Sequence, residues 1–106
     1  GTEARTRALV QALATAELFG GLSQALDEVE DFHPPEVVDA LWRGLRERDG
    51  GTAVHFAAML SYLRGAASAP FDWSQRPFFL SFHTEDAAER AAAIAELRRR
   101  LNLPAD

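Results

Sequence analysis

The chain has 106 residues, 47% of them hydrophobic and 25% charged, which is the composition of one small globular domain spanning residues 1–106. Sixteen acidic residues against eleven arginines give a net charge of −5, which disfavours nucleic acid as a partner because affinity for its phosphates depends on a basic surface. Cysteine is absent, and this excludes disulfides, thiolate zinc sites and a cysteine nucleophile.

No apolar run approaches the roughly 18 residues that a membrane-spanning helix needs, and no signal peptide opens the chain. The lack of lysine and the abundance of alanine are typical of a GC-rich bacterial genome. We therefore expect a cytoplasmic bacterial protein that makes no contact with a membrane.

Apolar residues recur at helical spacing through the first half of the chain and predict three amphipathic helices, over 2–18, 22–29 and 34–48. Two glycines separate the first two helices, because glycine readily adopts the left-handed conformation of a helix terminus. Two prolines open the third helix, where the N–H that proline lacks would be unpaired in any case.

The end of the second helix carries acidic side chains at the negative pole of the helix dipole, which is locally unfavourable. The acidic cluster consists of Asp27, Glu28, Glu30 and Asp31. A solvated face is the plain interpretation. The alternative is an acidic docking surface, typical of an inhibitor or immunity-type protein that neutralises a basic toxin, and it predicts that binding depends strongly on salt.

The segment 53–64 has hardly any polar side, which predicts a central helix covered on several faces. The stretch 49–51 ends the preceding helix, and Thr52 is the predicted N-cap of the new one. A connection this short makes helices 34–48 and 53–64 antiparallel neighbours in an αα-hairpin.

Residues 70–82 break the helical pattern, since five aromatic residues and two prolines fall within this stretch. Burial of so many rings is strongly favoured, and we expect an aromatic loop that lies over the helices as a lid before the last helix. An ion pair between Asp72 and Arg76 is expected to hold this lid, with Arg76 extended because Pro77 follows it.

A final helix is predicted over 84–101, with Thr84 as its N-cap and three arginines at its negative end. Its expected inner stripe is Ala87, Ala91, Ile94, Leu97 and Leu101. Its expected exposed ion pairs are Asp86–Arg90 and Glu96–Arg100. The whole pattern predicts an all-α fold of about five helices with no strand.

In the predicted hairpin, residues 34–65, the first helix carries the paired aliphatic residues 37 and 38, and the acidic-glycine turn 49–51 follows it. The second helix carries Val54, an alanine pair at 57 and 58 and then a leucine, before the closing Gly65. This pattern resembles a HEAT repeat. The chain departs from the repeat at His55, where an arginine is usual. The resemblance covers under a third of the chain and implies a HEAT-like superhelix, a C-terminal segment of a bacterial repeat protein, and a scaffold for other macromolecules.

No pattern in the chain indicates catalysis. The histidines lack the spacings of metal-binding helices, the glycine pairs read as helix stops rather than phosphate loops, and no nucleophile elbow surrounds a serine. We therefore expect neither enzyme activity nor a metal or other cofactor.

Side chains suited to contact another protein lie on the hairpin and in the aromatic loop. Protein interfaces favour tryptophan, tyrosine and arginine, and the candidates are Trp42, His55, Tyr62, Trp73 and Arg76. The leading hypothesis is a non-catalytic HEAT-like module that mediates protein–protein interaction. The acidic inhibitor is the alternative, a nucleic-acid-binding HEAT-like protein is a further one, and the identity of the partner and the oligomeric state stay open.

Overall fold

The structure, a computed structural model, describes residues 1–105 and is helical without any strand in that range, which confirms the predicted all-α class. Six α-helices occur there, where the sequence predicts about five. None of them has the length and apolar character needed to cross a membrane. The elements are α1 (Thr2–Thr15), α2 (Leu22–Asp31), α3 (Pro35–Glu47), α4 (Gly50–Leu63), the 3-10 turn η1 (Trp73–Gln75), α5 (Arg76–Phe79), the 3-10 turn η2 (Leu80–Phe82) and α6 (Ala87–Arg100).

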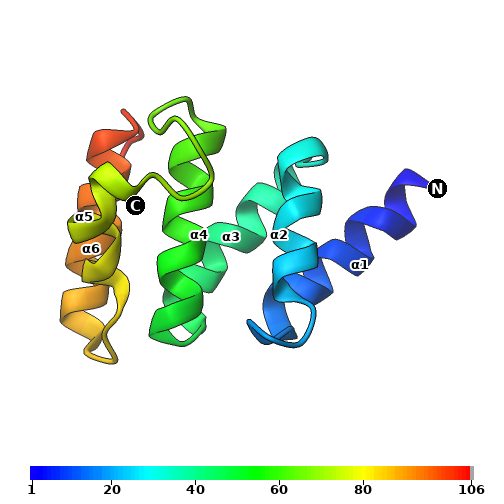
Figure 1. Cartoon of the computed structure of the whole chain (residues 1–106), viewed down its shortest axis with the longest axis horizontal. Coiled ribbons are helices and arrows are strands. Elements are labelled where there is room, and N and C mark those ends of the chain that lie inside the picture. The colour runs from blue at the N-terminus through cyan, green and yellow to red at the C-terminus, as the bar shows by residue number, and fades with distance from the viewer. Residues whose placement is uncertain (106) are drawn as a thin grey trace.

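The helices follow one another along the longest axis of the molecule, from α1 at one end to α6 at the other (Figure 1). Helix α3 lies between α1 and α6 and packs against α4, to which residues 48 and 49 join it. Helix α2 packs on α1, and the segment 76–82 packs between α4 and α6. Helix α4 therefore has neighbours on more than one side.

The predicted encasement of segment 53–64 is confirmed for most of its length. All side chains from 56 to 61 are buried, whereas His55, Tyr62 and Leu63 are half-buried and Arg64 is exposed. A helix that is apolar on all sides is stable only where other elements cover it, and α4 accordingly forms the centre of the core.

Helix α4 begins at Gly50 rather than at the predicted residue 53, because Asp49 and not Thr52 is its N-cap. The Asp49 carboxylate accepts hydrogen bonds from the Thr52 N–H at 3.0 Å and from the Thr52 hydroxyl at 3.1 Å. The backbone hydrogen bond is the main reason that the pKa of Asp49 is lowered. The glycines at 50 and 51 are thus the first turn of α4 and do not stop a helix.

Helix α6 spans Ala87–Arg100, which is shorter than the predicted 84–101. Its N-cap is Asp86, whose carboxylate accepts a hydrogen bond from the Glu89 N–H at 2.9 Å. The Thr84 hydroxyl instead accepts from the Asp86 N–H at 3.1 Å. The predicted capping role of Thr84 is wrong, because this hydrogen bond closes the turn that precedes the helix.

The predicted aromatic loop, 70–82, contains the additional helix α5 between two 3-10 turns. Arg76 has helical angles, φ −50° and ψ −44°, and not the extended backbone expected before a proline, because Pro77 lies in the first turn of α5. Phe79 and Phe82 are fully buried, so this part of the segment does cover the helices as predicted. The segment is a chain of short helical turns with Phe79 and Phe82 on its inner side.

Two arginines that follow helix ends donate hydrogen bonds to the unpaired carbonyl groups of other helix ends. The Arg48 guanidinium, just after α3, donates to the carbonyls of Leu13 at 2.6 Å and Ala16 at 2.5 Å, where α1 ends. Arg64, just after α4, donates to the Leu101 carbonyl at 3.2 Å, where α6 ends. Such bonds satisfy carbonyls that have no partner within their own helix and complement the negative pole of its dipole.

Arg90 of α6 likewise donates hydrogen bonds to carbonyl groups at the end of α3, and its side chain is only 8% exposed. Its guanidinium donates to the carbonyls of Leu45 at 2.7 Å, Arg48 at 3.0 Å and Thr84 at 2.6 Å. The exposed ion pair predicted between Asp86 and Arg90 is therefore wrong. Arg90 points inward and joins α6 to the end of α3, while Asp86 caps its own helix.

Candidate functional site

Three of the five residues predicted to contact a partner come together around Phe71, and the four together are called the ring surface: His55, Phe71, Trp73 and Arg76. The Phe71 ring centroid lies 5.8 Å from that of His55 and 4.9 Å from that of Trp73. The Arg76 guanidinium lies 5.5 Å from the Trp73 ring. The fold thus links α4 to the segment 71–76 through one continuous set of rings.

Trp73 is 70% exposed, although tryptophan usually buries most of its surface. Its backbone is held by Asp72, whose carboxylate accepts hydrogen bonds from the Ser74 N–H at 3.0 Å and the Ser74 hydroxyl at 2.7 Å. Those bonds lower the pKa of Asp72. The indole is thus presented to solvent from a hydrogen-bonded turn.

The predicted ion pair between Asp72 and Arg76 is wrong. Asp72 is the N-cap of η1 and accepts bonds from Ser74, whereas Arg76 stacks on the Trp73 ring. A cation over an aromatic face is attracted by the ring quadrupole, so Arg76 stabilises one orientation of the indole. The segment is held by a turn cap and a cation–π contact instead of by a salt bridge.

His55 is half-buried on α4 and lies against Phe71. Burial lowers the pKa of its imidazole, because desolvation disfavours the charged form. The neutral ring is therefore favoured near pH 7, and it extends the apolar base under Phe71 and Trp73. Part of this ring reaches the surface, as its place among the predicted contact residues requires.

The structure does not join Trp42 and Tyr62 to the ring surface. Trp42, on α3, is half-buried and lies under the Arg98 guanidinium at 5.2 Å from ring centroid to Cζ. Tyr62 is half-buried and packs against the hydrophobic core. Among residues 1–105, no ring contact connects either of them with Phe71 or Trp73.

The acidic cluster lies at the end of α2, as predicted, but one of its members is paired. The Glu28 carboxylate accepts a hydrogen bond from Arg5 Nε at 2.7 Å, and the same guanidinium lies 4.1 Å from the Phe32 ring. Asp27 and Asp31 are exposed. The surface offered to a basic partner is therefore centred on these two aspartates.

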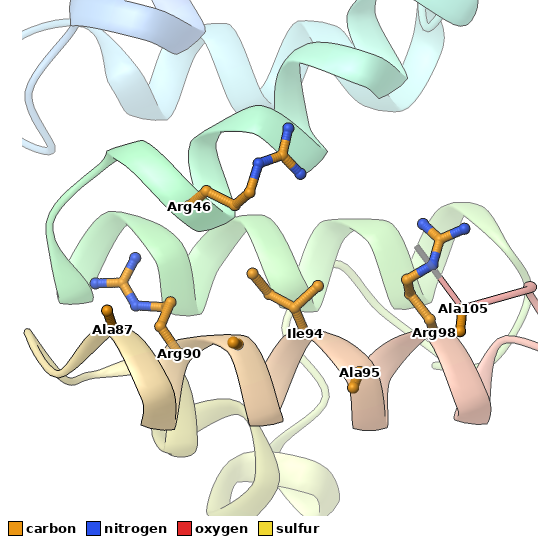
Figure 2. A pocket seen from close by; sticks show the side chains of 8 residues that line it. Arg46, Ala87, Arg90, Ile94, Ala95, Arg98 and Ala105 are labelled. Atoms are coloured by element: carbon orange, nitrogen blue, oxygen red, sulfur yellow. The ribbon is translucent and has the colours of Figure 1, made fainter.

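A groove between α3 and α6 is a surface that sequence reasoning missed. It has a volume of about 460 Å³, and Figure 2 shows its lining side chains. The lining residues are Arg46, Ala87, Arg90, Ala91, Ile94, Ala95, Arg98 and Ala105. Ala87 and Ala91 are exposed, so their predicted place in the inner stripe of the last helix is wrong. The spacing of four between alanines 87, 91 and 95 was the available signal.

The arginines at the end of α6 are engaged within the chain. Glu96 pairs with Arg99 at 2.5 Å and with Arg100 at 2.8 Å, and the latter pair is the one that the sequence predicted. The hydrogen bond from Arg99, followed by the one from Arg100, is the main reason that the pKa of Glu96 is lowered to about 2. The Arg100 guanidinium also lies 3.7 Å from the Phe78 ring. This end of α6 is thus a mixed-charge surface and not a run of unpaired cations.

Within residues 1–105, no group of three or more histidine, aspartate or glutamate side chains is placed to hold a metal ion. Comparison of the chain with family models, with curated proteins and with solved structures gave no match.

Proposed function

We propose that this chain is a non-catalytic, HEAT-like helical module that binds a protein partner through the ring surface. The observation that supports this proposal is the 70% exposure of Trp73, an indole that the fold fixes but does not cover. Residues that carry binding energy are enriched in tryptophan and arginine, and here Trp73 and Arg76 are in contact before any partner arrives.

Preorganisation strengthens this proposal, because a side chain that is already ordered loses little entropy on binding. Asp72 fixes the turn before the indole, and Gln75 Nε2 donates a hydrogen bond to the Ala66 carbonyl at 3.0 Å. The Phe71 ring supports one side of Trp73. An apolar or aromatic side chain of a partner would meet an ordered indole with a cation over one of its faces.

The HEAT-like arrangement is part of the proposal. Its support is the hairpin of α3 and α4, the packing of α2 on α1 before it, and the succession of elements along one axis (Figure 1). In arrays of this kind each helical pair buries its apolar face against the next pair. Such a scaffold places loops and helix ends along an extended surface, where the ring surface lies.

The acidic cluster supports a second candidate function, an inhibitor that neutralises a basic protein. The exposure of Asp27 and Asp31 favours it, whereas the pairing of Glu28 with Arg5 reduces the charge that the cluster presents. The two candidates differ in their response to salt, because association through exposed charges weakens as ionic strength rises. Association through a tryptophan anchor changes far less.

A selection for binding peptides tests the leading proposal. The full chain is immobilised and used to select binders from a displayed library of peptides, and each binder is then measured against Trp73→Ala, Arg76→Ala and a control, Phe19→Ala. Phe19 is the matched control because its ring is fully exposed on the turn between α1 and α2, away from the ring surface.

Binders that lose at least tenfold affinity on Trp73→Ala and none on Phe19→Ala support the ring surface, since truncation of an anchor side chain typically costs about 2 kcal/mol or more. Binders that keep their affinity for Trp73→Ala but lose it on Asp27→Arg and in high salt would support the acidic cluster as the binding surface in place of the ring surface. Selections in which both ring variants bind like the unchanged protein contradict the proposal.

A further inference from the structure

The groove between α3 and α6 has an apolar base and basic walls. Ile94 and the alanines at 87, 91 and 95 form the base along α6. Arg46 borders it from α3, with its guanidinium directed away from α6 in the view of Figure 2. Among residues 1–105, the groove is lined by three arginines and by no carboxylate, although the chain as a whole has a net charge of −5.

Arg90 contributes a positive charge to this groove and has no ion-pair partner among residues 1–105. It is 8% exposed, and its three hydrogen-bond acceptors are backbone carbonyls, which are neutral. Within residues 1–105 no carboxylate pairs with it, and its buried Nε has no acceptor there. A buried cation without a counter-ion attracts anionic groups to the nearest accessible surface.

Arg46 is the cation that a partner would meet directly. Its side chain is exposed, and it forms no hydrogen bond or ion pair within residues 1–105. Arg98 lines the same groove from α6, where its guanidinium lies over the Trp42 ring. The predicted contact residue Trp42 thus neighbours the groove through Arg98.

The base of the groove permits close approach of another helix. Ala87, Ala91 and Ala95 recur every fourth residue, so they lie in one row along α6. Short side chains in such a row let a second helix lie near the backbone of α6, where apolar side chains of that helix would reach Ile94. The exposed row is therefore a narrow apolar stripe along α6.

We propose that this groove binds an amphipathic helix of a partner protein whose apolar face is flanked by glutamate or aspartate. The apolar face would cover Ile94 and the alanine row, and the acidic flanks would lie beside Arg46 and the buried charge of Arg90. Charge complementarity of this kind directs which partner binds and in which orientation.

This inference rests on the proposed function only in treating the chain as a partner-binding module. The groove and the ring surface share no residue, so Trp73→Ala tests one and leaves the other unchanged. Loss of one interaction with retention of the other therefore shows which proposal fails.

The probe is a blocked helical peptide of roughly 18 residues, with leucine and alanine on one face and glutamate on both flanks. Its control is the same peptide with lysine in place of each glutamate. Binding of the fluorescein-labelled peptides to the full chain is followed by anisotropy at low and at high salt. We expect the glutamate peptide to bind and the lysine peptide not to bind, with affinity that falls as salt increases.

Two variants test the contacts, each with a matched control on the same helix. Arg46→Glu is expected to weaken binding of the glutamate peptide about three- to tenfold, because it removes an attraction and adds a repulsion. Its control is Arg43→Glu, an exposed arginine of α3 outside the groove. Ala91→Trp is expected to block the groove, and Ala88→Trp adds the same ring on α6 outside it. Unchanged circular dichroism shows that each variant is folded.

Equal binding of the glutamate and lysine peptides overturns the proposal, as do equal effects of Arg46→Glu and Arg43→Glu. Sedimentation of the unchanged chain provides a further test. Concentration-dependent self-association that Ala91→Trp abolishes would assign the groove to a second copy and overturn the proposal. Failure of the glutamate peptide to bind at any salt concentration would do so as well.

Discussion

Two regions of the molecule use large side chains in opposite ways. In the arginine junction, defined as Arg48, Arg90 and the carbonyl groups they bind, long side chains turn inward and satisfy backbone groups at helix ends. In the ring surface, Trp73 stays in solvent although its backbone is fixed. The junction stabilises the arrangement of the helices, whereas the Trp73 indole is largely uncovered and available for binding.

The comparison teaches that residue type alone does not indicate role in this chain. Arginine is buried at position 90 and exposed at position 46, and aromatic rings are buried at position 79 and exposed at position 73. What separates the members of each pair is whether the fold provides partners on all sides. Substitutions that compare the members of such pairs therefore test the distinction directly.

The largest expected effect is in the segment that carries both kinds of ring. Phe79→Ala should lower the free energy of unfolding by about 3–5 kcal/mol, because it leaves a cavity in the space that the fully buried ring fills. Trp73→Ala should lower it by less than about 1 kcal/mol, as expected for a largely exposed side chain. Urea unfolding followed by circular dichroism measures both. Equal losses would mean that Trp73 belongs to the core and not to a binding surface.

The next effect distinguishes the buried arginine from an exposed one. Arg90→Leu should cost about 3 kcal/mol, because carbonyls at the end of α3 and before α6 lose their charged donor while they stay buried. Arg99→Leu removes only an exposed ion pair with Glu96 and should leave the free energy of unfolding almost unchanged. The same urea titrations serve. A minor loss for Arg90→Leu would show that water replaces the guanidinium at the junction.

A smaller effect, with a change of sign, is expected for two glycines that lie in helices. A Cβ at Gly44 would lie 2.2 Å from Cε2 of the fully buried Phe56 ring, so Gly44→Ala should cost about 1–3 kcal/mol despite the better helix propensity of alanine. At Gly51 the nearest atom would lie at an ordinary 3.4 Å, and Gly51→Ala should stabilise the chain by up to about 0.5 kcal/mol. Stabilisation by both would show that the Phe56 ring moves aside easily.

The sequence was sufficient to predict the helical class and the buried position of α4, because the segment 53–64 has almost no polar residue that water could solvate. It was not sufficient for the helix ends. Asp49 and Thr52 are both good capping residues three positions apart, and only the observed hydrogen bonds show that Thr52 donates to Asp49. The same competition misplaced the start of α6, where Asp86 and not Thr84 is the N-cap.

The candidate surfaces could be predicted only in part, for a different reason. Sequence spacing gives the neighbours of a side chain within its own helix, so the Glu96–Arg100 pair was found. The acceptors of Arg90 include carbonyls 45 and 42 positions earlier in the chain, and no local rule identifies them. The groove was missed for the same reason, since it forms only when α3 brings Arg46 next to α6. The number of aromatic residues in segment 70–82 predicts that most of them pack against the helices, but it does not indicate which ring is exposed to solvent.

The smallest expected effect concerns pH and the base of the ring surface. Partial burial lowers the pKa of His55 below its ordinary value of 6.5, so the unfolded chain binds a proton more readily than the folded one. Stability from this group is therefore complete above the unfolded value and is lost as the pH falls through the folded value. His55→Gln removes this dependence, while His33 and His83 remain in both proteins.

The unchanged protein should therefore lose stability relative to His55→Gln as the pH is lowered from about 7 to about 5, and the difference should become constant at lower pH. Thermal melts of both proteins measure it, and NMR titration of the imidazole reports the pKa directly. Because the Phe71 ring contacts both His55 and Trp73, charging the imidazole should also alter tryptophan fluorescence in the same pH range. Identical melting profiles for the two proteins, with a His55 titration at 6.5 or above, would place this ring in solvent and separate α4 from the ring surface.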